Sequence, residues 1–180
     1  MKANHLVITA ILTLVFVGCK NEKKETEVVT VETSKETFNH EGEDIAVTFE
    51  DEKLNTVFKE YVAVKNALIN TDAAKTSANA SNLMTAFANI GVEDVALKAA
   101  QNIVESDNVE EQRASFVVVT AEVEKMLNNG TITSGNYFKQ YCPMAFNNNG
   151  GYWLSESDKI ANPYFGDKMY RCGRIDAKIE

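Results

Sequence analysis

Two cysteines and two methionines near the C-terminal end are the side chains in this sequence best suited to chemistry. Cys142 and Met144 stand in the run Tyr-Cys-Pro-Met, and Met169 and Cys172 stand in the run Met-Tyr-Arg-Cys. Thiolate and thioether sulfur are the ligands that soft ions such as Cu(I) prefer. Cysteines in an oxidising compartment also form disulfides. The four residues therefore indicate either a soft-metal site with Cys142, Met144, Met169 and Cys172 as ligands, or a Cys142–Cys172 disulfide.

The two runs are predicted to come together as strands. Residues 137–142 and 169–175 alternate in the way that half-buried strands do. Paired as an antiparallel hairpin, they would make Cys142 and Cys172 neighbours. The stretch between them includes residues 146–151, whose asparagines and glycines favour turns because both residue types tolerate a positive φ. We therefore expect a loop-rich C-terminal segment with one β-hairpin.

Residues 53–129 carry the pattern of four helices. Apolar side chains recur there every three or four residues, which is the spacing of an amphipathic helix. Asp72 and Asp107 are suited to begin helices, and Gly91 is suited to separate two of them. Short joints between helices favour an antiparallel bundle. The predicted fold class is therefore mainly α: a four-helix antiparallel bundle followed by the loop-rich C-terminal segment with its β-hairpin.

Each of the four predicted helices carries a stripe of residues that recur on one face. The first stripe is Leu54, Phe58, Tyr61, Lys65 and Leu68, and the fourth is Val109, Arg113, Phe116, Thr120, Val123 and Leu127. The second stripe is Ala80, Leu83, Met84, Phe87 and Ile90, and the third is Val92, Val95, Ala96, Ala99, Ala100 and Ile103. All four are interpreted as the faces that pack together in the core.

Three short motifs stand in the C-terminal segment: Cys-Pro-Met-Ala at 142–145, Gly-Tyr-Trp-Leu at 151–154, and a longer run at 162–173 that reads Asn-Pro-Tyr-Phe-Gly-Asp-Lys-Met-x-x-Cys-Gly. Together they resemble the signature of an uncharacterised bacterial domain family, and the resemblance extends over residues 53–176. That domain occurs alone in lipoproteins and fused to periplasmic adaptor (membrane-fusion) subunits of copper and silver efflux pumps. The resemblance implies a role in copper or silver handling, with Cu(I) or Ag(I) as candidate ion and an efflux adaptor as candidate partner.

The N-terminal end has the features of a bacterial lipoprotein signal. Lys2 gives it a charged start, and residues 6–17 form an apolar run too short to span a bilayer as a mature helix. A small residue precedes Cys19, as cleavage requires. We expect residues 1–18 to be removed as a signal peptide and Cys19 to be lipidated, which would anchor the exported protein to a membrane. An ordinary secretory signal and an uncleaved anchor are the alternatives.

Residues 19–52 are predicted to be the lipidated cysteine and a disordered acidic tether. Between residues 20 and 52, four lysines stand against eleven carboxylates, a net charge of −7 in a chain of −8. Such a composition cannot bury enough apolar surface to order itself. The alternating run at 45–49 is an exception and fits a short docking strand. The folded domain is therefore predicted to span residues 53–180, with the two sulfur runs as its C-terminal cap.

Standard catalytic signatures are missing from the sequence. It contains no glycine-rich phosphate loop, no His-Glu-x-x-His zinc motif and no Cys-x-x-Cys redox motif. Its two histidines, His5 and His40, precede the predicted domain, and His40 is expected to be exposed. The acidic balance argues against nucleic acid as a partner, because such binding favours basic patches. These observations predict a protein that is not an enzyme.

Three functions remain open, the third being a thiol redox enzyme, against which the missing Cys-x-x-Cys motif argues. The first is a membrane-anchored lipoprotein, facing the periplasm or the cell surface, that takes part in copper or silver handling and binds Cu(I) through its cysteines and methionines. The second is a structural or interaction domain, stapled by a Cys142–Cys172 disulfide, that docks to an efflux adaptor without binding metal. A lipidated Cys19 would leave the other two cysteines as an even pair, which suits either of the first two functions in an exported protein.

Overall fold

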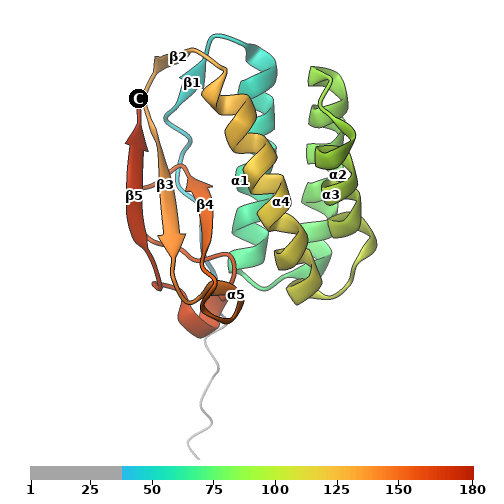
Figure 1. The fold of residues 1–180 in the computed structure, drawn as a ribbon, viewed down its shortest axis with the longest axis vertical. Coiled ribbons are helices and arrows are strands. Elements are labelled where there is room, and N and C mark those ends of the chain that lie inside the picture. The colour runs from blue at the N-terminus through green and yellow to red at the C-terminus, as the bar shows by residue number, and fades with distance from the viewer. Residues whose placement is uncertain (1–37) are drawn as a thin grey trace, which may run out of the picture. The chain divides into compact units, whose positions relative to one another are not determined.

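In a computed structural model, residues 38–180 are described, and four helices pack beside a small antiparallel sheet (Figure 1). The helices are α1 (Glu52–Ile69), α2 (Ala73–Ile90), α3 (Asp94–Glu105) and α4 (Val109–Asn128). Each helix packs against the next one along the chain, and α1 also packs against α4. Because the joints are short, consecutive helices run in opposite directions. The predicted four-helix antiparallel bundle is confirmed.

Several predicted features lie outside the described residues. These are the signal peptide at 1–18, the lipidation candidate Cys19 and the part of the tether that ends at residue 37. Within residues 38–180, no helix combines the length and the apolar character that a membrane span requires.

The last residues assigned to the tether make ordered contacts in the structure. Strand β1 (Thr48–Phe49) pairs antiparallel with β2 (Ile132–Ser134), which follows the bundle. The ring of Phe49 is buried in the core, and its centroid lies 6.3 Å from the centroid of the Phe58 ring of α1. The packed part of the chain thus begins before residue 53, the predicted boundary, and the alternating run at 45–49 contributes a short strand to it.

Polar side chains set the beginnings of the helices. The Asp51 and Asp72 carboxylates accept hydrogen bonds from backbone amides in the first turns of α1 and α2, and the Asn108 side chain does the same for α4. The α4 cap therefore lies one residue beyond the predicted Asp107. Gly91 ends α2 with a φ of 80°, a left-handed conformation that glycine adopts without a Cβ clash.

Tyr61 joins the bundle to the sheet. Its ring stacks on Phe116 of α4 with centroids 5.1 Å apart. Its hydroxyl accepts a hydrogen bond from the Leu154 amide and shares another with the Thr120 hydroxyl, both at 3.0 Å. Burial raises the pKa of Tyr61 well above its usual range, so the hydroxyl keeps its proton. Through these contacts, the Tyr61 side chain sets the distance of α1 from both α4 and the neighbouring strand.

The C-terminal sheet has three antiparallel strands in the order β4-β3-β5. They are β3 (Tyr137–Cys142), β4 (Gly151–Ser155) and β5 (Arg174–Ile179). The predicted partner of β3 was residues 169–175, but Gly166–Met169 is a 3₁₀ turn and β5 begins at Arg174. β4 was not predicted as a strand, since four of its five residues are buried and the sequence shows no alternation there.

Candidate functional site

The cap brings together the two cysteines that the sequence singled out. Cys142 ends β3 and is fully buried, whereas Cys172 lies half-buried in the turn before β5. Their Sγ atoms are 2.7 Å apart, and both cysteines are free. This contact follows from the antiparallel pairing of β3 with β5, which sets the start of β5 beside the end of β3.

Asn162 holds the turn that carries Cys172. Its side-chain Nδ2 donates to the Cys172 carbonyl at 2.7 Å, and its Oδ1 accepts from the Tyr164 amide at 2.8 Å. Its own backbone amide donates to the Tyr170 carbonyl at 2.9 Å. Asn162 is fully buried, so these bonds are shielded from water. We interpret it as a positioning residue for Cys172, a role that nothing in the sequence assigned to it.

The two methionines lie in different surroundings. Met144 is 45% exposed in the turn after β3, and its backbone amide acts to lower the pKa of the Cys172 thiol. Met169 ends the 3₁₀ turn and is half-buried, and its carbonyl accepts a hydrogen bond from the Cys172 amide at 3.0 Å. Each methionine therefore contacts the Cys172 segment through its backbone, which keeps both close to the cysteine pair.

Met144 leads directly into a strained turn between β3 and β4. Phe146, Asn147 and Asn148 all have left-handed backbone conformations, with φ between 51° and 67°. Asparagine tolerates this conformation, whereas each strained residue of another type costs about 1–3 kcal/mol. The Phe146 ring offsets part of that cost by an edge-on contact with Tyr164, with centroids 4.9 Å apart. The turn is thus held in one shape by packing, and it fixes the direction in which the chain leaves Met144.

The environment of Cys172 favours its protonated thiol. Burial, a hydrogen bond with Cys142 and the charge that Cys142 can carry together raise the pKa of Cys172 to about 11. The backbone amide of Met144 lowers that pKa, but by less. A protonated thiol is a weak nucleophile and must lose its proton before it can bind a metal ion.

The separation of the sulfur atoms limits how they could share an ion. Metal–sulfur bonds are about 2.3 Å long for zinc, so two sulfurs only 2.7 Å apart would form an unusually narrow angle at the ion. Cys142 is fixed in a buried strand, whereas Cys172 lies in a half-buried turn. Movement of Cys172 is therefore the simplest way to admit an ion. Among residues 38–180, no group of three or more His, Cys, Asp or Glu side chains is arranged to hold a metal.

A polar cluster that sequence reasoning missed supports the same loop. Lys65 of α1 and Glu156, which follows β4, form an ion pair in which each side chain is 1% exposed. His40 is half-buried rather than exposed as expected, and its Nδ1 shares a 2.9 Å hydrogen bond with the Tyr170 hydroxyl. Burial and the nearby Lys65 charge lower the pKa of His40. The ion pair holds the chain after β4 against α1, and the Tyr170 hydrogen bond ties the chain after the 3₁₀ turn to His40.

Arg113 is the second buried basic group and acts on the same region. Its Nε donates to the Pro163 carbonyl at 2.8 Å, and one terminal nitrogen donates to the Leu68 carbonyl at 3.0 Å. The guanidinium also pairs with the exposed Glu110 at 2.8 Å. The signal for both missed groups was present in the helical stripes, because Lys65 and Arg113 interrupt otherwise apolar faces. A basic residue on a core face must find acceptors inside the protein.

A protein-family model matches part of the chain. Residues 57–135 match the model of a family described as "Protein of unknown function (DUF3347)". The matched stretch begins within α1 and ends just after β2, so it contains the bundle except the start of α1, and it precedes both cysteines of the cap. No curated protein and no solved structure matches the chain. The bundle is thus similar to a domain of unknown function, and the similarity does not extend to either cysteine of the cap.

Proposed function

We propose that this chain is an exported lipoprotein that takes part in copper or silver handling, with Cys142, Met144, Met169 and Cys172 as the ligands of Cu(I). The observation that carries the proposal is the contact of two free thiols in a segment that also holds two thioethers. Such a set of soft donors suits a monovalent soft ion. The resemblance of the cap motifs to domains on copper and silver efflux adaptors supports the choice of ion. The role is binding and delivery rather than catalysis.

Binding would exchange thiol protons for the ion. Each cysteine that becomes a thiolate ligand releases one proton, and no electron is transferred if the ion arrives as Cu(I). Because Cys172 has a pKa of about 11, protons compete with the ion over the whole neutral range. Cys172 would move away from Cys142 as the ion enters, which its position in a turn allows. Met144, being partly exposed, is free to follow the ion.

Replacing either methionine by leucine removes the thioether ligand while keeping the packing of the side chain. Met→Leu keeps the volume and apolarity of the side chain and usually costs less than about 1.5 kcal/mol in stability. We expect Met144→Leu and Met169→Leu each to weaken Cu(I) binding by about tenfold or more, equivalent to about 1.4 kcal/mol. The measurement is a competition titration of the reduced chain against a Cu(I) chelator, on a Cys19→Ser background so that an unlipidated third thiol does not bind.

Met84→Leu is the matched control for this titration. Met84 is partly buried on α2, within the bundle, and has no part in the proposed site. Its replacement should leave Cu(I) affinity unchanged. Equal affinity of wild type and both cap variants would exclude the thioethers as ligands. Wild-type binding no tighter than that of a Cys142→Ser, Cys172→Ser double variant would exclude the site altogether.

Membrane anchoring through Cys19 is the second part of the proposal and rests on the N-terminal sequence. Cys19→Ser removes the thiol that would carry the lipid, so we expect the protein to be released from membranes or left unprocessed. Fractionation and the mass of the N-terminal peptide measure both effects. Mature protein found on membranes at wild-type amounts in this variant would contradict lipidation.

The disulfide-stapled interaction domain is the second candidate, and the sulfur contact itself favours it. Two thiols 2.7 Å apart need only a small movement to form a bond of about 2.05 Å. The reaction removes two protons and two electrons, which an oxidising compartment accepts. Closing the loop between Cys142 and Cys172 would stabilise the domain by about 2–4 kcal/mol. Protein extracted from the periplasm that is fully oxidised and free of copper, together with methionine variants that bind like wild type, would favour this candidate.

A further inference from the structure

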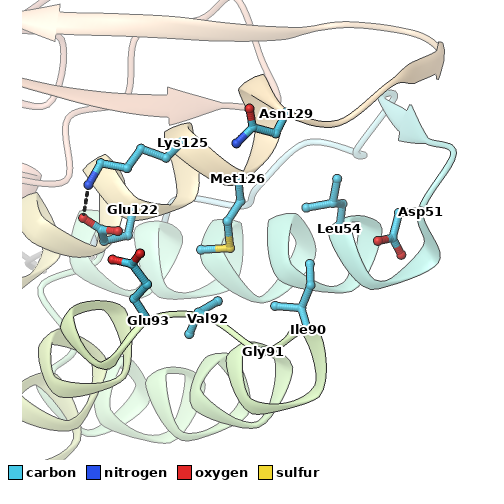
Figure 2. A pocket seen from close by; sticks show the side chains of 10 residues that line it. All are labelled: Asp51, Leu54, Ile90, Gly91, Val92, Glu93, Glu122, Lys125, Met126 and Asn129. Carbon is cyan, nitrogen blue, oxygen red and sulfur yellow. Dashed lines mark hydrogen bonds and ion pairs between the residues drawn. The ribbon is translucent and has the colours of Figure 1, made fainter.

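A groove lies at one end of the bundle, remote in sequence from the cap (Figure 2). It has a volume of about 510 Å³ and is bounded by the start of α1, the joint between α2 and α3, and the last turns of α4. That volume is in the range of small-molecule sites, which is about 300–1,000 Å³. The groove uses none of the residues that the proposed copper site needs.

The floor of the groove is apolar. Figure 2 shows the Met126 thioether in the middle, above Val92, with Leu54 and Ile90 on one side. Leu54 is 6% exposed, and the other three are partly buried against the core. Methionine is flexible and adapts its shape to different apolar partners. The floor could therefore cover an apolar body without a change in the backbone.

The rim of the groove is acidic. Asp51, Glu93 and Glu122 contribute three carboxylates to its lining, and Lys125 contributes one ammonium. Lys125 is already bonded to Glu122 at 2.6 Å, which leaves the rim with a net negative charge. The side chain of Glu93 makes no capping hydrogen bond to α3, and in Figure 2 it extends towards Met126 and Glu122. Its carboxylate is therefore available to a ligand.

The helix dipoles do not change the sign of the electrostatic potential that the rim charges create in the groove. Two helices, α1 and α3, begin at the groove, and two others, α2 and α4, end there. Their partial charges of about half an elementary charge have opposite signs and largely cancel. The carboxylates therefore decide which charge the groove attracts.

We propose that this groove binds an organic cation with an apolar body, such as a quaternary ammonium or phosphonium compound. An apolar body covers the methionine and aliphatic floor, and the cationic centre lies beside the carboxylate of Glu93. A neutral apolar compound would remove water from those carboxylates without replacing its hydrogen bonds, which is costly. An anion of the same shape would be repelled. The proposal is independent of the copper site and can fail or succeed without it.

Tetraphenylphosphonium and tetraphenylborate test the charge requirement, because they share size and shape and differ in sign. The probe is the methyl signal of Met126 in NMR spectra of the full chain carrying Cys19→Ser, with the exposed Met144 methyl as an internal reference. We expect the phosphonium ion to shift the Met126 signal saturably and the borate ion to leave it in place. Binding should weaken as salt is raised, because exposed charges are screened.

Glu93→Gln and Asp44→Asn are the matched variants. Each removes one exposed carboxylate, but Asp44 does not line the groove. Glu93→Gln should weaken phosphonium binding about twofold to fivefold, the usual size of one exposed charge contact, and Asp44→Asn should not. Three results would overturn the proposal: equal binding of the borate ion, an unshifted Met126 signal, or a Met126 shift that depends on protein concentration alone, which would mean that a second copy occupies the groove.

Discussion

Glu156→Gln is expected to lower the free energy of unfolding by about 3–5 kcal/mol, because it leaves the Lys65 ammonium buried without its carboxylate. Both side chains are 1% exposed, so water cannot replace the lost partner. Burial already lowers the pKa of Lys65, and Glu156 is the largest influence that opposes this shift. Urea denaturation followed by circular dichroism measures the effect as a lower midpoint.

Two further variants test whether burial is the cause. Glu43→Gln breaks the pair with Lys159, whose side chains are 41% and 73% exposed, and should change the stability by less than about 1 kcal/mol. Replacing Lys65 and Glu156 together by methionine and leucine removes both charges and should restore most of the stability, since apolar replacement of a buried pair is often neutral. A loss under about 1 kcal/mol in Glu156→Gln would mean that water reaches Lys65.

The bundle could be predicted because its signals are local. Apolar residues at spacings of three and four identified each helix, and Asp72 and Gly91 marked boundaries that the structure confirms. The same pattern also contained Lys65 and Arg113 on core faces. Their partners, Glu156 and the Pro163 carbonyl, lie 91 and 50 residues away in the chain. Sequence spacing within a helix carries no information about such distant acceptors.

The structure of the cap was harder to predict, because its contacts also join residues far apart in the chain. Strand β3 was expected, and its antiparallel pairing with the chain near Cys172 is present, although β5 begins at Arg174. β4 was missed because a strand buried on both faces does not alternate. The conformation around Cys172 depends on Asn162, whose hydrogen bonds join three separate points of the loop. A buried amide in a loop looks like an ordinary turn residue until those partners are known.

The candidate site, too, could be predicted only in part. The contact between Cys142 and Cys172 could be expected, because each cysteine stands in a strand-like run and the two runs were predicted to pair. Ligation of an ion by Met144 and Met169 stays a prediction, because the contacts that place them beside Cys172 are made by their backbones, and the Met144 side chain is partly exposed. Which of the two sulfur chemistries operates is decided by the compartment and its redox state as well as by the fold.

Cys172→Ser should lower Cu(I) affinity more than Met144→Leu does. Loss of an outer partner of a metal site costs about 10- to 100-fold in affinity, and loss of a thiolate ligand itself should exceed that range. We therefore expect Cu(I) affinity to fall by more than about 100-fold, against about tenfold for Met144→Leu. Serine keeps the size of the side chain but offers a hard oxygen that the soft ion disfavours. The chelator competition described for the methionines measures both losses on one scale.

The pH dependence of binding distinguishes a lost ligand from a disturbed fold. The pKa of Cys172 is raised to about 11, so below that pH each ion bound at this thiol displaces a proton. Wild-type affinity should therefore rise with pH, by about tenfold per unit for each proton displaced between about pH 6 and pH 8. Cys172→Ser should remove the Cys172 share of this slope, whereas Met144→Leu should weaken binding and keep the slope. A slope unchanged by Cys172→Ser would show that this thiol does not ligate the ion.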